Sequence, residues 1–204
     1  MRRGTVAGVV GALLAVIVLG GCRENGGSPR PGPEQRLTRD ERIRKAFGDF
    51  ADGAAEKPGA SVSPSDYVLV GTDRAPDGAA VSLWASADPA GPSLCFWLDV
   101  EREGGFAQGA GGCGAPGGYE VSLSGDTSLS VGRLGEWRAV SVQVSAAGLD
   151  PVTVPVVSRC FLVPARFTYE RDVPLTLTLL DAGGKVVAVA KDVPAVGTVL
   201  PKAP

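Results

Sequence analysis

The 204-residue chain contains no histidine, and only four cysteines and one methionine. Without histidine there is no Ser-His-Asp triad, no Cys-His pair and no His-ligated zinc or copper site. No serine is followed by lysine three positions later, which removes Ser-x-x-Lys chemistry as well. The sequence therefore predicts a protein that is not an enzyme and that uses no cofactor.

The chain also lacks an excess of positive charge. It has 20 lysines and arginines against 22 aspartates and glutamates, a net charge of −2 at pH 7. A weakly acidic protein has no electrostatic attraction to nucleic acid, so we expect no nucleic-acid partner. The richness in Ala, Gly, Val, Pro and Arg resembles proteins of high-GC genomes such as those of actinobacteria.

The first charged residues, Arg2 and Arg3, are followed by an uncharged and largely apolar run over residues 5–21. This layout is typical of a secretory signal. The run ends in Leu19-Gly20-Gly21-Cys22, an aliphatic residue, two small residues and a cysteine. This tetrapeptide resembles the lipobox of bacterial lipoproteins, in which the cysteine thiol receives a diacylglyceryl group and the peptide is cut just before it. The alternative is an ordinary N-terminal membrane anchor with an incidental cysteine.

The resemblance implies a protein held on the extracytoplasmic face of the cell membrane by the lipid on Cys22, because two acyl chains anchor stably. Residues 1–21 are the expected signal peptide. Residues 22–36 are polar and rich in Gly and Pro, which predicts a disordered tether. We expect an amphipathic helix segment at 37–58 and a single β-domain at 59–204.

A helix is predicted over residues 38–52. Thr38 followed by Glu41 fits a capping box. Apolar residues recur at helical spacing, opposite a polar face that includes Arg42. These apolar residues are Ile43, Phe47, Phe50, Ala51 and Ala54. We expect the helix to pack on its own domain; the alternative is a helix for a partner or a membrane surface.

From Tyr67 onward the apolar period changes to two, which indicates strands with one apolar face. The alternating apolar sets are Leu94, Phe96, Leu98 and Val100; Val121 and Leu123; Val140, Val142 and Val144; and Val173, Leu175, Leu177 and Leu179. Turns are expected at residues 75–78, 124–126, 149–151 and 181–184. Seven to nine short strands predict an all-β, antiparallel β-sandwich of immunoglobulin-like architecture with one N-terminal helix. The alternative is a small β-barrel.

The glycine-rich stretch 104–114 is predicted as a loop. It contains a formal Gly-x-Gly-x-x-Gly at Gly109, Gly111 and Gly114. A dinucleotide site needs this motif to begin a helix, but Pro116 and two glycines follow here. We interpret the match as chance.

Asp99, Glu101 and Glu103 share one face if the strand beginning at Leu94 continues that far. Three carboxylates at a strand end are weak candidates for calcium ligands or for the acid and base of a glycosidase. The simpler interpretation is a solvated strand end that discourages edge pairing. We expect no metal site.

Trp84 and Trp97 both alternate onto the wetter strand face, and together with Trp137 they are the candidates for an aromatic binding surface. Packing under the helix at 38–52 is the favoured interpretation.

Three cysteines remain outside the cell once Cys22 is lipidated, and one disulfide is expected there. We favour Cys95–Cys113, joined through the flexible glycine-rich stretch, with Cys160 free and buried. Cys95–Cys160, with Cys113 free, is the rival pairing.

Together these features predict a membrane-anchored envelope lipoprotein whose β-domain binds an unknown envelope protein or ligand without catalysis. Two alternatives remain. One is a secreted hydrolase using the carboxylates near residues 99–103, and the other is an assembly factor for another envelope protein.

Overall fold

The structure is a computed structural model that describes residues 36–55, 66–86, 94–103, 105–114, 121–124, 129–135, 138–168 and 173–194. All of these belong to one compact unit, residues 31–204. Residues 1–35, which include the lipobox with Cys22 and nearly all of the expected tether, lie outside the described residues, as does Trp137. In the described part, no helix has the length and apolar character needed to cross a membrane.

The predicted N-terminal helix is present as α1, Arg39–Ala55. Its start is the expected capping box: the N–H of Glu41 donates to Thr38 Oγ1 at 3.3 Å, and the N–H of Thr38 donates to Glu41 Oε2 at 2.7 Å. These two bonds satisfy backbone donors that have no partner within the helix. Ile43 and Phe47 are fully buried, so the apolar stripe packs on the domain, as expected.

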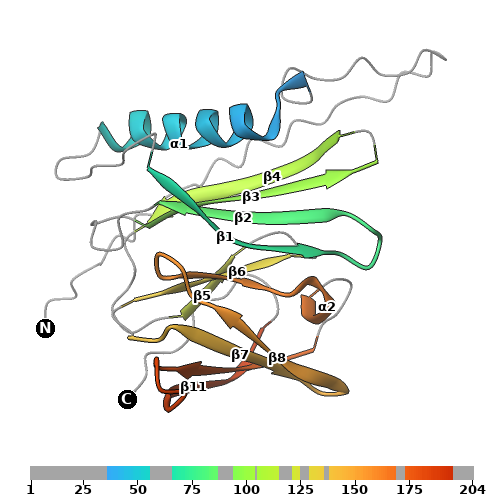
Figure 1. Cartoon of the computed structure of the whole chain (residues 1–204), viewed down its shortest axis with the longest axis vertical. Coiled ribbons are helices and arrows are strands. Elements are labelled where there is room, and N and C mark those ends of the chain that lie inside the picture. The colour runs from blue at the N-terminus through green and yellow to red at the C-terminus, as the bar shows by residue number, and fades with distance from the viewer. Residues whose placement is uncertain are drawn as a thin grey trace, which may run out of the picture. The chain divides into compact units, whose positions relative to one another are not determined.

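The strands form three antiparallel sheets, which we call A, B and C (Figure 1). Sheet A consists, in spatial order, of β1 Tyr67–Arg74, β2 Ala80–Ser86, β3 Leu94–Arg102 and β4 Gly105–Gly114. Sheet B consists of β5 Val121–Ser124, β6 Ser130–Leu134 and β9 Cys160–Val163. Sheet C consists of β11 Val186–Val193, β10 Leu175–Leu180, β7 Ser141–Ala146 and β8 Leu149–Pro155. A short helix, α2 Ala165–Thr168, follows β9.

Alternation along β6 and β9 of sheet B sends side chains to both neighbouring sheets. Val131, Cys160 and Leu162 belong to the core shared with sheet A. Phe161 and Val163 belong to the core shared with sheet C. Helix α1 covers the opposite face of sheet A, so the layers run α1, A, B, C (Figure 1).

The prediction of an all-β antiparallel sandwich with one N-terminal helix is confirmed, and the described strands form no closed barrel. The sandwich has three sheets, one more than an immunoglobulin-like arrangement has. The apolar pattern of the sequence did not reveal the third sheet, because both faces of the short sheet B are covered.

Two local predictions hold and two fail. The turns at 75–78 and 181–184 are present, closed by Gly78 N–H to Ala75 O at 2.8 Å and Gly184 N–H to Asp181 O at 2.9 Å. Residues 149–151, which were expected to form a turn, are instead the beginning of β8. The turn lies just before them, where Gly148 has a φ of 75°. Val140 was expected inside the core but precedes β7 and is 48% exposed.

Candidate functional site

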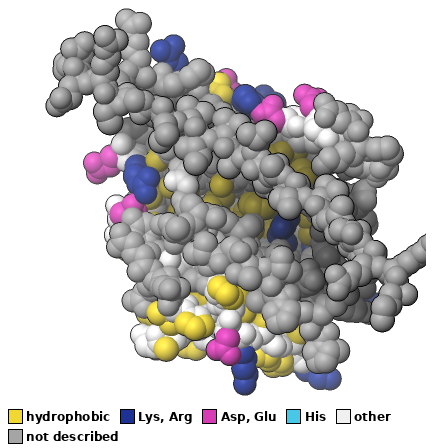
Figure 2. All heavy atoms as spheres, turned by 180° about the vertical axis from the view of Figure 1, so that it is seen from behind, with side chains coloured by type: hydrophobic (Ala, Val, Ile, Leu, Met, Phe, Trp, Pro, Cys, Tyr) yellow, Lys and Arg dark blue, Asp and Glu magenta, His cyan; other side chains and the backbone are white. Residues whose placement is uncertain are grey.

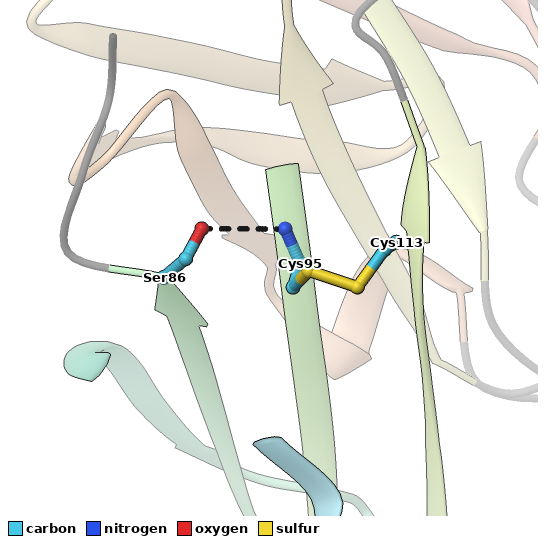
Figure 3. The surroundings of a disulfide bond; sticks show 3 residues. All are labelled: Ser86, Cys95 and Cys113. Carbon is cyan, nitrogen blue, oxygen red and sulfur yellow. Dashed lines mark hydrogen bonds between the residues drawn. A yellow bond between two sulfur atoms is a disulfide. The ribbon is translucent and has the colours of Figure 1, made fainter. Parts of the chain in front are cut away.

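The Cys95–Cys113 disulfide joins the neighbouring strands β3 and β4, with Cα atoms 4.0 Å apart (Figure 3). The N–H of Cys95 points the other way, toward β2, where it donates to Ser86 Oγ at 3.3 Å. Cys160 is free and buried. The favoured pairing is therefore confirmed, and the rival Cys95–Cys160 pairing is wrong because these two side chains lie in different cores.

The glycine-rich stretch 104–114 was predicted to be a loop, and this was wrong: residues 105–114 form strand β4. Backbone pairing with β3 needs no side chains, and the Trp97 ring takes the space that side chains would fill. A Cβ atom on Gly109 would lie 2.2 Å from Trp97 Cζ2. Glycine is thus required there by a close approach of a ring to the backbone.

Asp99 and Arg42 form a buried ion pair between β3 and α1. The guanidinium donates through Nε to Asp99 Oδ1 at 3.0 Å and through Nη2 to Oδ2 at 2.8 Å. The Asp99 side chain is 0% exposed and that of Arg42 is 5% exposed. Asp99 and its hydrogen bonds raise the pKa of Arg42. Arg42 Nη1 also donates to the carbonyl of Leu37 at 2.8 Å, which ties down the chain just before the helix.

Glu101 extends this pair into a network. It accepts from Arg42 Nη2 at 2.6 Å and forms an ion pair with Arg39. Hydrogen bonding from Arg39, with that from Arg42, lowers the pKa of Glu101. Glu103 lies apart, exposed in the turn after β3.

The arginines take up the carboxylate oxygens that a calcium ion would need, and the described residues contain no group of three or more metal-binding side chains. Asp99 and Glu101 thus serve an ion-pair network with Arg42 and Arg39, and the absence of a metal site stays a prediction. The interpretation of a solvated strand end is wrong, because Asp99 is covered by α1. Sequence reasoning missed Arg42, which it placed on the polar face of the helix. Its position beside Ile43, at the flank of the apolar stripe, was the available signal.

Trp84 and Trp97 face each other across β2 and β3. Both pack against the buried cluster of Ile43, Phe47 and Cys95 beneath α1. This is the packing interpretation favoured above, and both rings are only partly buried. Trp97 also contributes to a small hollow of about 140 Å³ where α1 meets β4. Its lining residues are Leu37, Arg42, Lys45, Ala46, Asp49, Phe50, Trp97 and Phe106.

A larger groove of about 360 Å³ opens where the middle sheet ends at β9, between edge strands β1 and β8. Its walls are mostly apolar. They include Val70 and Gly71 of β1, Val152 and Val154 of β8, and Leu162 of β9. Asp73 and Arg166 at the rim already have partners: Asp73 accepts from the N–H of Ala165 at 2.7 Å, and Arg166 donates to Asp150 O at 2.7 Å. The groove volume lies within the range of about 300–1,000 Å³ that ligand sites have.

Hydrophobic side chains also gather over sheet C, as Figure 2 shows. Val140, Val186 and Val189 are each about half exposed there. Single exposed valines on a sheet are ordinary, so these three residues carry no argument for a binding site.

The Cys160 thiol is not a candidate nucleophile. Burial raises its pKa to about 12, against the opposing charges of Arg133 and Arg159. A catalytic thiol needs a lowered pKa and access to solvent, and this one has neither.

Comparison with known protein families, with curated proteins and with solved structures gave no significant match.

Proposed function

We propose that the chain is a membrane-anchored lipoprotein of the bacterial cell envelope and that its β-domain is a non-catalytic binding module. The observation that carries the extracytoplasmic location is the Cys95–Cys113 disulfide, since such bonds form and persist in oxidising compartments. It agrees with the export signal and the lipobox at Leu19-Gly20-Gly21-Cys22. The lipid on Cys22 is the proposed anchor.

The chemistry near β3 supports binding over hydrolysis. A carboxylate-dependent hydrolase needs one carboxyl group whose pKa is raised, so that it donates a proton. Glu101 has a lowered pKa, and Asp99 is buried against Arg42. These side chains hold α1 on sheet A. The groove between β1 and β8 is the proposed place for an apolar part of a ligand or partner.

The anchor is tested by changing one thiol. Cys22→Ser should prevent lipidation and with it the cut before residue 22, so the chain should keep its signal peptide and carry no lipid mass. Gly20→Ala keeps a small residue in the lipobox and should be processed normally, which makes it the matched control. Unchanged processing of the Cys22→Ser chain would show that the anchoring proposal is wrong.

The groove is tested by crosslinking in intact membranes. Val154→Lys places a charge in the groove, and Val189→Lys places the same charge on the exposed face of sheet C. Crosslinked products should be lost with Val154→Lys alone, provided that both variants retain the wild-type circular dichroism spectrum. Equal products from both variants would mean that the partner binds elsewhere.

A further inference from the structure

The floor of the groove between β1 and β8 is the edge strand of the middle sheet, β9. Sheets A and C have four described strands each, whereas sheet B has three and ends at β9. Leu162 of β9 lines the groove together with residues of both outer sheets. Strand β9, Cys160–Val163, has neither charge nor proline, which are the usual devices that block an edge strand. The groove therefore lies beside an unprotected edge of sheet B.

The backbone of Leu162 directs its polar groups toward the groove side of β9. The N–H of Leu134 donates to the carbonyl of Arg159 at 2.7 Å, so Arg159 faces β6. Cys160 faces the other way, since it exchanges backbone hydrogen bonds with Val157 at 2.8 and 2.9 Å. Alternation along an antiparallel strand then turns the N–H and C=O of Leu162 away from β6, as those of Cys160 are turned.

Both ends of this edge are closed, which fixes where another chain can pair with it. At one end, the outward backbone groups of Cys160 already have their partners. At the other end, Pro164 has no N–H, and the N–H of Ala165 donates to Asp73 Oδ2 at 2.7 Å. An extended chain that pairs with β9 must therefore place one of its residues opposite Leu162.

The walls of the groove match the side chains of an extended chain in that position. Successive side chains of a strand point to opposite faces. The residue opposite Leu162 would point toward sheet A, as Leu162 does, where Gly71 leaves the wall of β1 without a side chain. The residues before and after it would point toward sheet C. There Val152 and Val154 of β8 lie two positions apart on one face, which is the same spacing.

We propose that the groove binds an extended apolar peptide segment of a partner protein, which adds to β9 as a fourth strand of sheet B. The inference rests on the proposed function and names the chemistry of the partner: three consecutive apolar residues, the central one paired with Leu162. A strand between two sheets takes about 4.8 Å by 10 Å by 3.4 Å, or about 160 Å³ per residue. The groove of about 360 Å³ thus holds about two residues, the central one and half of each neighbour.

Hydrogen bonds at the rim hold the groove in shape before the peptide binds. Asp73 ties β1 to the segment after β9, and Arg166 ties the same segment to β8 by donating to Asp150 O at 2.7 Å. A groove that is formed in advance lowers the entropic cost of binding.

The backbone of Leu162 also selects a peptide over other apolar ligands. Leu162 is 6% exposed, and a backbone N–H or C=O that is covered without a partner costs free energy. An acyl chain in the groove would cover both groups and satisfy neither. A peptide residue in extended conformation exchanges two hydrogen bonds with them, as in other cases of strand addition to a sheet edge.

The test is the binding of two dye-labelled peptides to the full-length chain in lipid nanodiscs, followed by fluorescence anisotropy with empty nanodiscs as the blank. The first peptide is Thr-Val-Val-Val-Thr-amide, which should bind saturably. The second differs only by a methyl group on the backbone nitrogen of the central valine. It keeps the apolar side chains but loses one donor, and it should bind about tenfold more weakly.

Equal binding of the two peptides would show that the groove takes any apolar ligand, such as an acyl chain, and would overturn the proposal. Failure of both peptides to bind would overturn it as well. Because both measurements use the wild-type chain, neither depends on the folding of a variant.

The variants Val154→Lys and Val189→Lys separate this inference from the proposed function. Peptide binding should be lost with Val154→Lys and kept with Val189→Lys. If the crosslinked products depend on Val154 but the two peptides bind equally, the groove is the partner site and strand addition is wrong. If the products persist in Val154→Lys, the proposed partner site fails, and the comparison of the two peptides alone decides strand addition.

Discussion

Replacing Arg42 with methionine isolates the interaction that holds α1 on sheet A. Methionine keeps much of the length and apolar stem of arginine while removing the guanidinium. Asp99 then stays in a fully buried position without its two strong hydrogen bonds, at 3.0 and 2.8 Å. Removing one partner of a buried ion pair is strongly destabilising because the other charge remains out of water.

The expected loss in the free energy of unfolding depends on the contacts that Asp99 retains in the Arg42→Met variant. Breaking a buried pair costs about 3–5 kcal/mol. Asp99 retains the Trp97 Nε1 donor at 3.4 Å and Arg39 Nε at 3.8 Å, both longer contacts. We therefore expect the lower end of that range, about 3 kcal/mol in the free energy of unfolding. For a domain of this size this is a fall in melting temperature of about 6–12 °C.

The assay is urea unfolding of a chain beginning at Leu37, followed by tryptophan fluorescence. Trp84 and Trp97 lie beneath α1, so their emission reports on the undocking of the helix. Arg44→Met is the matched control, because Arg44 is exposed, and it should change stability by less than about 0.5 kcal/mol.

The double variant Arg42→Met/Asp99→Leu should recover most of the loss, since two apolar side chains replace both charges. Equal small effects of Arg42→Met and Arg44→Met would refute the reasoning. So would a double variant that is less stable than Arg42→Met alone, because the penalty would then not come from the unpaired carboxylate.

Three further predictions concern the disulfide, the carboxylate network and the free thiol. Changing Cys95 and Cys113 together to serine should lower the free energy of unfolding by about 3 kcal/mol, the loop-closure value for this separation, as measured by urea titration; a loss below about 1 kcal/mol would contradict it. Glu101 has a folded-state pKa below its ordinary 4.5, so its contribution to stability is present above pH 4.5 and is lost as the pH falls through the folded pKa. The urea concentration at the unfolding midpoint should therefore decrease as the pH is lowered through that window, and it should decrease less steeply in Glu101→Gln. Cys160 should resist iodoacetamide at pH 8 in the folded protein and react fully in guanidinium, as judged by mass; rapid labelling of the folded protein would show that the thiol is not buried.

The sequence by itself determined the features that depend on near neighbours. The capping box at Thr38 and Glu41 needs only a spacing of three residues, and it is formed as expected. The apolar alternation of Leu175, Leu177 and Leu179 identifies their buried face whichever sheet covers it. The choice of Cys95 and Cys113 also succeeded, although the reason given was flexibility of a loop that is in fact strand β4.

Only the tertiary structure decided which polar residues near α1 are buried. Asp99 alternates onto what the pattern marks as the wet face of β3, yet it is buried because α1 covers that face. Arg42 is drawn inward by this carboxylate, 57 positions away in the chain. The glycines of β4 form a strand because its hydrogen bonds come from β3 and its space is filled by the Trp97 ring. Local patterns fix which faces are apolar, whereas the partner that covers each face is chosen by contacts between distant segments, which no short stretch of sequence contains.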